Sequence, residues 1–146
     1  MILLLMLLSN AAYAVVDVSV SFGTINILTN QTSTLNMTLV NSATSIANGL
    51  AFTNNLPTGV VVQSVTSNSC GGTLTATPGV GSFSLSGGAV PQTVGTLTGQ
   101  CTLLVVVKAA TAGTQTDTMA VGSVTTTDQG SNPKAASASL TVSSPS

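Results

Sequence analysis

Apolar and hydroxyl-bearing residues alternate along most of this chain with a period of two. In residues 16–22 the two faces are apolar and polar, with Val16, Val18, Val20 and Phe22 alternating with Asp17, Ser19 and Ser21. Successive side chains of an extended strand point to opposite faces of a sheet, so this alternation predicts a strand with one buried face. Beyond residue 15, no window of eleven residues keeps a helical period, and the chain is therefore expected to be all-β.

Further short segments have the composition of strands. They are residues 35–39, 50–52, 60–65, 73–77, 82–85, 103–107, 114–121, 123–127 and 137–142. Residues 103–107 form a continuous apolar run, which predicts a central strand that is covered on both faces.

Turn signals separate these segments. They are Asn48-Gly49, Leu56-Pro57-Thr58-Gly59, Gly71-Gly72, Pro78-Gly79, Gly87-Gly88 and Asn132-Pro133. Glycine adopts a positive φ and proline fixes φ, so each signal predicts a chain reversal. About nine strands at intervals of about ten residues are typical of an immunoglobulin-like antiparallel β-sandwich. We expect this sandwich over residues 15–142, followed by a polar tail at 143–146.

The N-terminal residues have the features of an export signal. An apolar run, residues 2–8, is followed by Ala12-Tyr13-Ala14, which fits the small-residue rule for signal-peptide cleavage. Residues 1–14 are therefore expected to be a signal peptide cleaved after Ala14, or a short hydrophobic segment that is retained. No membrane span is expected beyond this segment, because a spanning helix needs about 20 apolar residues and Asp17 follows too soon. Export predicts an extracellular or cell-surface location.

Only five side chains carry a formal charge, and the chain has no His, Glu, Arg or Trp. General acid–base catalysis needs a group that exchanges a proton near the working pH, and nucleophilic catalysis by Ser or Thr needs such a group as its base. The composition therefore predicts a protein that is not an enzyme and needs no cofactor. A net charge of −1 with two lysines also excludes the basic surface that nucleic-acid binding requires.

Three polar residues near the C-terminus were considered as calcium ligands through their oxygen atoms: Asp117, Asp128 and Asn132. Isolated, solvated surface charges are the favoured interpretation, so no metal site is expected.

Asn30-Gln31-Thr32 and Asn36-Met37-Thr38 match the acceptor pattern for N-linked glycans, but the pattern arises by chance in a chain rich in Asn and Thr. Glycosylation of Asn30 or Asn36 stays open.

The aromatic residues after position 15 are Phe22, Phe52 and Phe83. We expect these three rings to fill the core, which leaves none to stack on a carbohydrate.

Cys70 and Cys101 are the only cysteines. In an exported chain an even number of cysteines favours a disulfide, while two free buried thiols remain the alternative and a zinc site is less favoured than either.

Several short motifs resemble a family of bacterial secreted conserved-repeat domains, which have immunoglobulin-like or fibronectin-like sandwich folds and often occur in surface adhesins. The motifs are Leu56-Pro57-Thr58-Gly59-Val60, Asn68-Ser69-Cys70-Gly71-Gly72-Thr73, Thr77-Pro78-Gly79, Ser84-Leu85-Ser86-Gly87-Gly88, Cys101 and Ser137-Ala138-Ser139-Leu140-Thr141-Val142. The resemblance implies that Cys70 pairs with Cys101 and that the domain is structural or adhesive. The chain departs from the family at Asn54-Asn55, where an Asp often precedes the "LP" turn, so an acidic site at that turn is not expected.

Two functions follow as hypotheses. The first is a non-enzymatic structural or adhesive module of the cell envelope, whose partners are other copies of itself or neighbouring cell-surface domains. The second is a subunit of an extracellular filament or pilus that assembles by strand exchange between copies, with residues 15–22 and 137–142 as donor strands.

Overall fold

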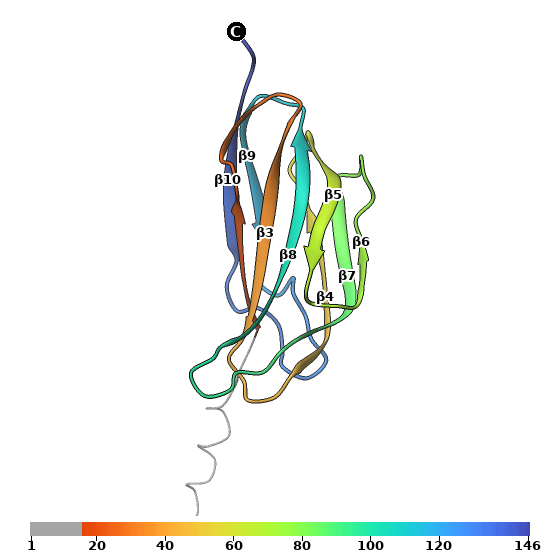
Figure 1. The fold of residues 1–146 in the computed structure, drawn as a ribbon, viewed down its shortest axis with the longest axis vertical. Helices are drawn as coiled ribbons and strands as arrows, with labels where there is room; N and C mark the ends of the chain where they lie inside the picture. The colour runs from red at the N-terminus through yellow and green to blue at the C-terminus, as the bar shows by residue number, and fades with distance from the viewer. Residues whose placement is uncertain (1–15) are drawn as a thin grey trace, which may run out of the picture.

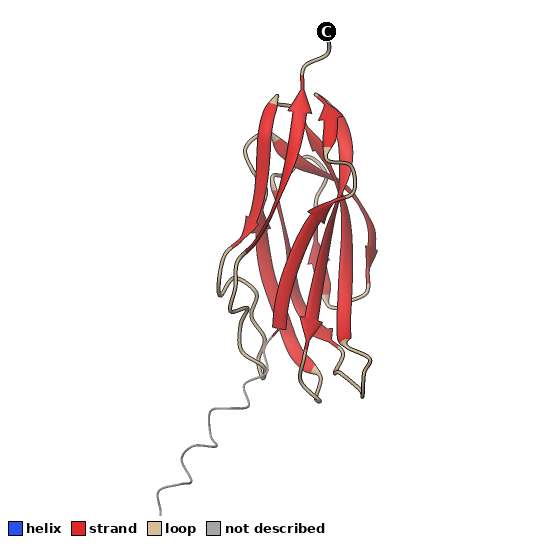
Figure 2. Ribbon diagram, turned by 90° about the vertical axis from the view of Figure 1, so that its left-hand side faces the viewer, coloured by secondary structure: helices blue, strands red, loops and turns tan. Residues whose placement is uncertain are grey.

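The structure is a computed structural model, which describes residues 16–146; the expected signal peptide, residues 1–14, lies outside them. The described chain is built from strands and connecting loops (Figure 2). Ten strands follow one another: β1 (Val16–Phe22), β2 (Asn26–Leu28), β3 (Gln31–Asn41), β4 (Ala47–Asn55), β5 (Val60–Asn68), β6 (Thr73–Thr75), β7 (Ser82–Val90), β8 (Gly99–Ala109), β9 (Gly113–Met119) and β10 (Ala136–Ser143).

The strands form a two-layered sandwich (Figure 1). One layer is a four-stranded antiparallel sheet in the order β1-β3-β8-β5. The other contains two three-stranded sheets, β2-β10-β9 and β4-β7-β6, in which β2 and β10 are the parallel pair. The expected all-β sandwich is confirmed. The strands β9 and β4 do not form a β-ladder with each other, so the second layer is interrupted between its two sheets. We call this boundary between β9 and β4 the seam.

The core lies between the layers and is built from the alternating apolar residues. Leu35, Met37 and Leu39 of β3 are fully buried. The rings of Phe52 and Phe83 pack edge to face, with centroids 6.3 Å apart. Phe22 is buried as well, so the expectation that all three phenylalanines fill the core is confirmed.

Strand β8 is central in its sheet, as its sequence predicts, but it is not covered on both faces. Val105 and Val107 are buried, whereas Leu104 and Val106 are only partly buried. The outer face of this layer has no third layer to cover it, because the sandwich has only two. The prediction from the continuous apolar run is therefore wrong for the outer face.

One further strand prediction is wrong, and one strand was missed. Residues 123–127 form no strand, because Thr125 makes only isolated bridges, to Ala51 and to Ser131. Strand β2 was not predicted. It has three residues, of which only Ile27 is buried, and such a short segment shows no periodicity.

Asn48-Gly49 and Gly87-Gly88 were expected to reverse the chain, and this expectation is wrong. Both pairs lie inside strands, at a register shift between β4 and β7 where Leu50 pairs with Gly88. Gly49 and Gly87 do adopt a positive φ, of 63° and 67°. The backbone freedom of glycine is used here for an irregular strand pairing rather than for a turn.

Strand β10, which contains one of the two expected donor segments, is paired within its own sandwich. It pairs with β9 along residues 136–142 and with β2 along residues 141–143. Residues 137–142 are therefore already paired within their own sandwich, which does not favour the hypothesis that they are donated to another copy. Strand β1 is an edge strand of its sheet, as the filament hypothesis requires.

Among residues 16–146, no helix is long and apolar enough to cross a membrane.

Candidate functional site

A disulfide joins Cys70, in the loop after β5, to Cys101 in β8. The sulfur atoms are 1.98 Å apart and the Cα atoms 5.1 Å apart. This arrangement agrees with the expected pairing and excludes both free thiols and a zinc site at these residues. The bond fastens the end of β5 to the strand with which β5 already pairs.

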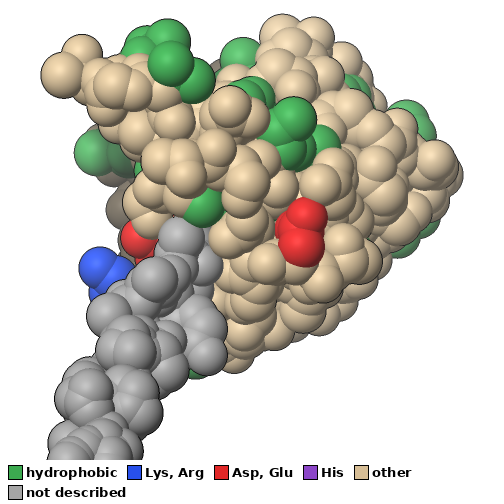
Figure 3. Space-filling view, turned by 90° about the horizontal axis from the view of Figure 1, so that it is seen from below, with side chains coloured by type: hydrophobic (Ala, Val, Ile, Leu, Met, Phe, Trp, Pro, Cys, Tyr) green, Lys and Arg blue, Asp and Glu red, His purple; other side chains and the backbone are tan. Residues whose placement is uncertain are grey.

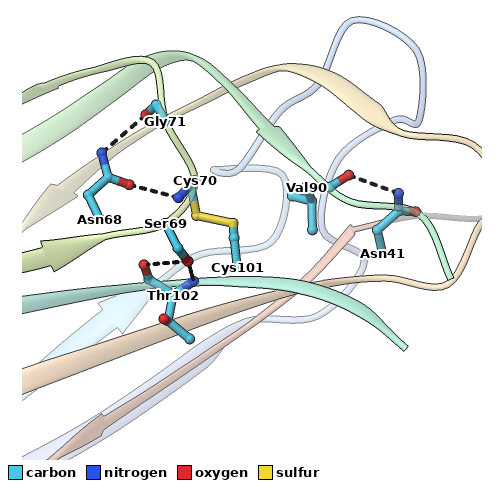
Figure 4. Close-up of a disulfide and its surroundings, with 8 residues drawn as sticks. All are labelled: Asn41, Asn68, Ser69, Cys70, Gly71, Val90, Cys101 and Thr102. Carbon is cyan, nitrogen blue, oxygen red and sulfur yellow. Dashed lines mark hydrogen bonds between the residues drawn. A yellow bond between two sulfur atoms is a disulfide. The ribbon is translucent and has the colours of Figure 1, made fainter. Parts of the chain in front are cut away.

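Hydrogen bonds shape the loop that carries Cys70 (Figure 4). The Asn68 side chain accepts from the backbone N–H of Cys70 at 2.9 Å and donates to the carbonyl of Gly71 at 3.1 Å. The backbone N–H of Ser69 donates to the Thr102 carbonyl at 2.9 Å, and the N–H of Thr102 donates to Ser69 Oγ at 2.8 Å. Both cysteines are buried, so the disulfide is a structural element rather than a reactive one.

Asp117 is buried in the seam between β9 and β4, and not solvated at the surface as the sequence suggested. Its Oδ2 accepts a hydrogen bond of 2.9 Å from the side-chain amide of Asn54. Both residues are fully buried, and Asp117 Oδ1 and Asn54 Oδ1 have no hydrogen-bond partner. Burial raises the pKa of Asp117, and the hydrogen bond from Asn54 opposes this rise with a smaller effect. Asp117 lies two positions before buried Met119 and therefore on the same face of β9. This spacing is the sequence signal that could have placed Asp117 in the core.

We expect Asp117→Asn to stabilise the protein at pH 8 by about 1 kcal/mol, because it replaces a poorly compensated buried carboxylate with a neutral amide that can donate to Asn54 Oδ1. In the unfolded chain the carboxyl titrates near its ordinary pKa of 3.8. The folded chain holds the proton more tightly, so the wild-type protein loses stability as the pH rises from about that value through the raised pKa. Urea unfolding between pH 4 and pH 8 measures this loss, and the variant should lack it.

Asp128→Asn is the control, because hydrogen bonds from Asn48 lower the pKa of exposed Asp128. Its contribution has the opposite sign: it is present above the ordinary pKa and is lost as the pH falls through the lowered one. Equal pH dependence in wild type and Asp117→Asn would contradict the assignment to Asp117.

The three residues considered as calcium ligands have separate roles. Asp128 accepts from the backbone N–H and the side-chain amide of Asn48, both at 2.9 Å. Asn132 is buried and accepts from the backbone N–H of Val124 at 2.8 Å, while its amide donates to the carbonyls of Ala120 and Lys134. Asp117 bonds to Asn54. Within residues 16–146, no cluster of three His, Cys, Asp or Glu side chains is arranged to hold a metal ion.

The two sequons lie in different environments. Asn30 is exposed in the turn between β2 and β3, with a positive φ of 67°. Asn36 lies partly buried on the outer face of β3, where its amide approaches Ser21 Oγ at 3.4 Å.

A groove lies between the beginning of β1 and the beginning of β10. Its volume is about 370 Å³, and its walls are residues 17–20 on one side and 134–137 on the other. Two of the five formal charges of the chain, Asp17 and Lys134, line it. The sequence alone could not bring these segments together, because they are more than a hundred positions apart.

The lower end of the sandwich, as drawn in Figure 1, carries the β3–β4, β7–β8 and β9–β10 loops. Four large apolar side chains are exposed on these loops: Ile46, Val94, Leu97 and Val121. Seen from below, the hydrophobic side chains that are in view lie in separate groups (Figure 3).

Solved structures with a similar fold include cohesin modules. A non-cellulosomal cohesin from the archaeon Archaeoglobus fulgidus has a TM-score of 0.56 at 9% identity, covering 86% of this chain and 91% of that one. The cohesin module of a family 33 glycoside hydrolase from Clostridium perfringens has a TM-score of 0.53 at 7% identity, covering 90% and 99%. A type I cohesin–dockerin complex from Clostridium thermocellum matches with a TM-score of 0.53 at 10% identity, covering 88% and 94%. At these identities the likeness concerns the fold.

No curated protein matches the chain. A family model does, over residues 17–142, which is nearly the whole sandwich. This match does not test the resemblance to the adhesin repeats, which stays a prediction. The chain belongs to the family described as a domain of unknown function, DUF7933.

Proposed function

We propose that this domain is a non-catalytic protein-interaction module that works outside the cell or at its surface, as a structural or adhesive unit. The proposal rests on the observation that most of the few reactive side chains are already bonded within the fold. Asp117 and Asp128 are each bonded to an asparagine, and both cysteines are consumed by the disulfide.

The remaining charged groups do not complete a catalytic arrangement. Lys108 lies on the outer face of β8, and Lys134 is exposed in the loop before β10. Activation of a serine by lysine needs a desolvated amine beside the hydroxyl. Neither lysine of the described chain is arranged in this way, so we expect the domain to act through the shape and hydrogen bonding of its surface.

Two further observations support this proposal. The similar structures include a cohesin in complex with a dockerin, which is a case of protein binding by a sandwich of this kind. The disulfide is favoured by an oxidising compartment, in agreement with the expected export. The filament alternative is less favoured, because β10 already pairs with β9 along residues 136–142 and with β2 at residues 141–143.

A localisation and binding experiment tests the proposal. Antibodies against the domain should label intact producing cells, and the native protein should contain no free thiol. Immobilised domain should bind at least one secreted or envelope protein of those cells saturably, with a Kd below about 100 µM. The proposal would be contradicted if the domain were found in the cytoplasm with its two cysteines reduced. It would also be contradicted if the immobilised domain bound no secreted protein and no envelope protein saturably.

A further inference from the structure

Residues 123–129 of the β9–β10 loop cross the seam and lie along the edge of β4 that β7 leaves free. The backbone N–H and carbonyl of Ala51 exchange hydrogen bonds with those of Thr125, both at 2.9 Å. The N–H of Thr127 donates to the Asn48 carbonyl, also at 2.9 Å. We call residues 123–129 the latch, because they close this edge of β4 without forming a strand.

The latch ends in a turn that presents Asp128. The Thr126 hydroxyl donates to the Gly130 carbonyl at 2.8 Å and accepts from the N–H of Gln129 at 2.9 Å. The exposed carboxylate of Asp128 accepts from both the backbone N–H and the side-chain amide of Asn48. The position of the Asn48 side chain is therefore tied to whether the latch is closed.

An irregularity at Gly49 turns two backbone positions of β4 toward the latch. Asn48 and Ala51 are three residues apart, and in a regular strand their backbone groups would point to opposite edges. The register shift between β4 and β7 at this point lets both face the latch. Gly49 has a φ of 63°, and a Cβ at this position would collide with the Thr127 side chain. A glycine is therefore required directly after Asn48.

This requirement creates a reactive pair, because Asn48-Gly49 is the single Asn–Gly pair in the sequence. In deamidation, the backbone nitrogen of the following residue attacks the side-chain carbonyl carbon of asparagine. Glycine has no side chain and leaves that nitrogen least crowded. The attack needs the Asn48 side chain to fold over the Gly49 nitrogen, whereas the hydrogen bond to Asp128 holds it toward the latch. A closed latch therefore suppresses the reaction.

We propose that Asn48 is a deamidation site and that Asp128 protects it for as long as the latch is closed. When the latch opens, the Gly49 nitrogen forms a bond to Asn48 Cγ and the bond from Cγ to Nδ2 breaks. The side-chain nitrogen leaves as ammonia and takes the Gly49 amide proton with it. Water then opens the resulting succinimide ring to aspartate or isoaspartate. Water is the only other reactant, and Asn48 is exposed to it.

The product changes the latch that protected the site. Aspartate or isoaspartate at position 48 replaces the amide donor by a carboxylate, so two carboxylates face each other across the former hydrogen bond to Asp128. Isoaspartate also lengthens the backbone of β4 by one carbon. Deamidation therefore releases the latch irreversibly and leaves the backbone groups of Ala51 at an open strand edge. This modification is independent of the proposed function.

Mass spectrometry of proteolytic peptides tests the protection by Asp128. The native protein and its Asp128→Ala variant are incubated at pH 8, and aspartate and isoaspartate at position 48 are quantified over time. Asp128→Ala should deamidate at Asn48 at least about tenfold faster, because the side chain of Asn48 and the latch both lose their anchor. Asp128→Asn should give an intermediate rate, since its amide oxygen can still accept one hydrogen bond from Asn48.

Asn68-Ser69 is the matched control site. The Asn68 side chain is likewise fixed, by hydrogen bonds with the backbone of Cys70 and Gly71, but it lies in another loop. The deamidation rate of Asn68 should be the same in the native protein and both variants. A faster reaction at Asn68 in Asp128→Ala would indicate general destabilisation and would overturn the role of Asp128. Equal rates at Asn48 in wild type and Asp128→Ala would overturn it as well.

Hydrogen exchange of the Asn48→Asp variant, which reproduces the aspartate product, tests the release of the latch. The amides of Ala51 and Thr125 should exchange at least about tenfold faster than in the wild-type protein. The amide of Val62, which donates to the Val80 carbonyl and belongs to the other layer, should be unchanged. Unchanged exchange at Ala51 and Thr125 would show that the product leaves the latch closed, which contradicts the proposed release.

Discussion

Replacing Cys70 and Cys101 together by alanine is expected to lower the free energy of unfolding by about 3 to 4 kcal/mol. The bond closes a loop with a sequence separation of 31, and in the chain-entropy model a loop of that length contributes about this much by restricting the unfolded chain. Both residues are also buried, so the alanines leave some space unfilled. Urea unfolding followed by circular dichroism measures the change.

Reduced wild-type protein is the control, because it keeps both sulfur atoms and loses only the cross-link. Its loss of stability should be close to that of the double variant, with the small remainder due to packing. A loss below about 1 kcal/mol in both proteins would show that the disulfide contributes little to this fold.

Phe83→Ala is expected to cost about 3 to 5 kcal/mol, the usual range for removing a buried phenylalanine. Phe83 is 2% exposed and packs edge to face against Phe52, so little of the surrounding core can collapse into the space. Phe83 also pairs in register with Asn54, which holds Asp117 across the seam. The change should therefore also alter the pH dependence of stability that Asp117 confers.

Two comparisons make this prediction specific. Phe83→Leu keeps most of the volume and should cost under about 1.5 kcal/mol. Val80→Ala lies in the loop just before β7, where Val80 is 45% exposed, and should change stability by less than about 0.5 kcal/mol. A cost for Phe83→Ala no larger than that for Val80→Ala would mean that the aromatic pair is not part of the core.

The strands with a clear period of two could be predicted from the sequence. Residues 16–22 form β1 as expected, and the alternation through Leu35, Met37 and Leu39 became β3. The failures came where periodicity gives no information. Strand β2 has only three residues, and residues 123–127 make their hydrogen bonds to loop atoms and to Asn48 and Ala51 of β4 without forming a ladder.

The polar residues were harder to place, because a sequence does not show which side chains meet. Asp117 was expected at the surface, yet it lies in the core because its side chain is on the same face of β9 as that of buried Met119. The pairing of Cys70 with Cys101 was easier to foresee, since only one disulfide is possible in a chain with two cysteines. The groove beside β1 could not be anticipated at all.

The sequence by itself determined that this protein is a β-sandwich with few ionisable side chains, because strand periodicity and composition are local properties of the chain. Only the tertiary structure decided which strand edges stay open and which carboxylates are buried. Those features depend on where β2 stops along β10 and on how β9 meets β4, and contacts between distant segments fix both.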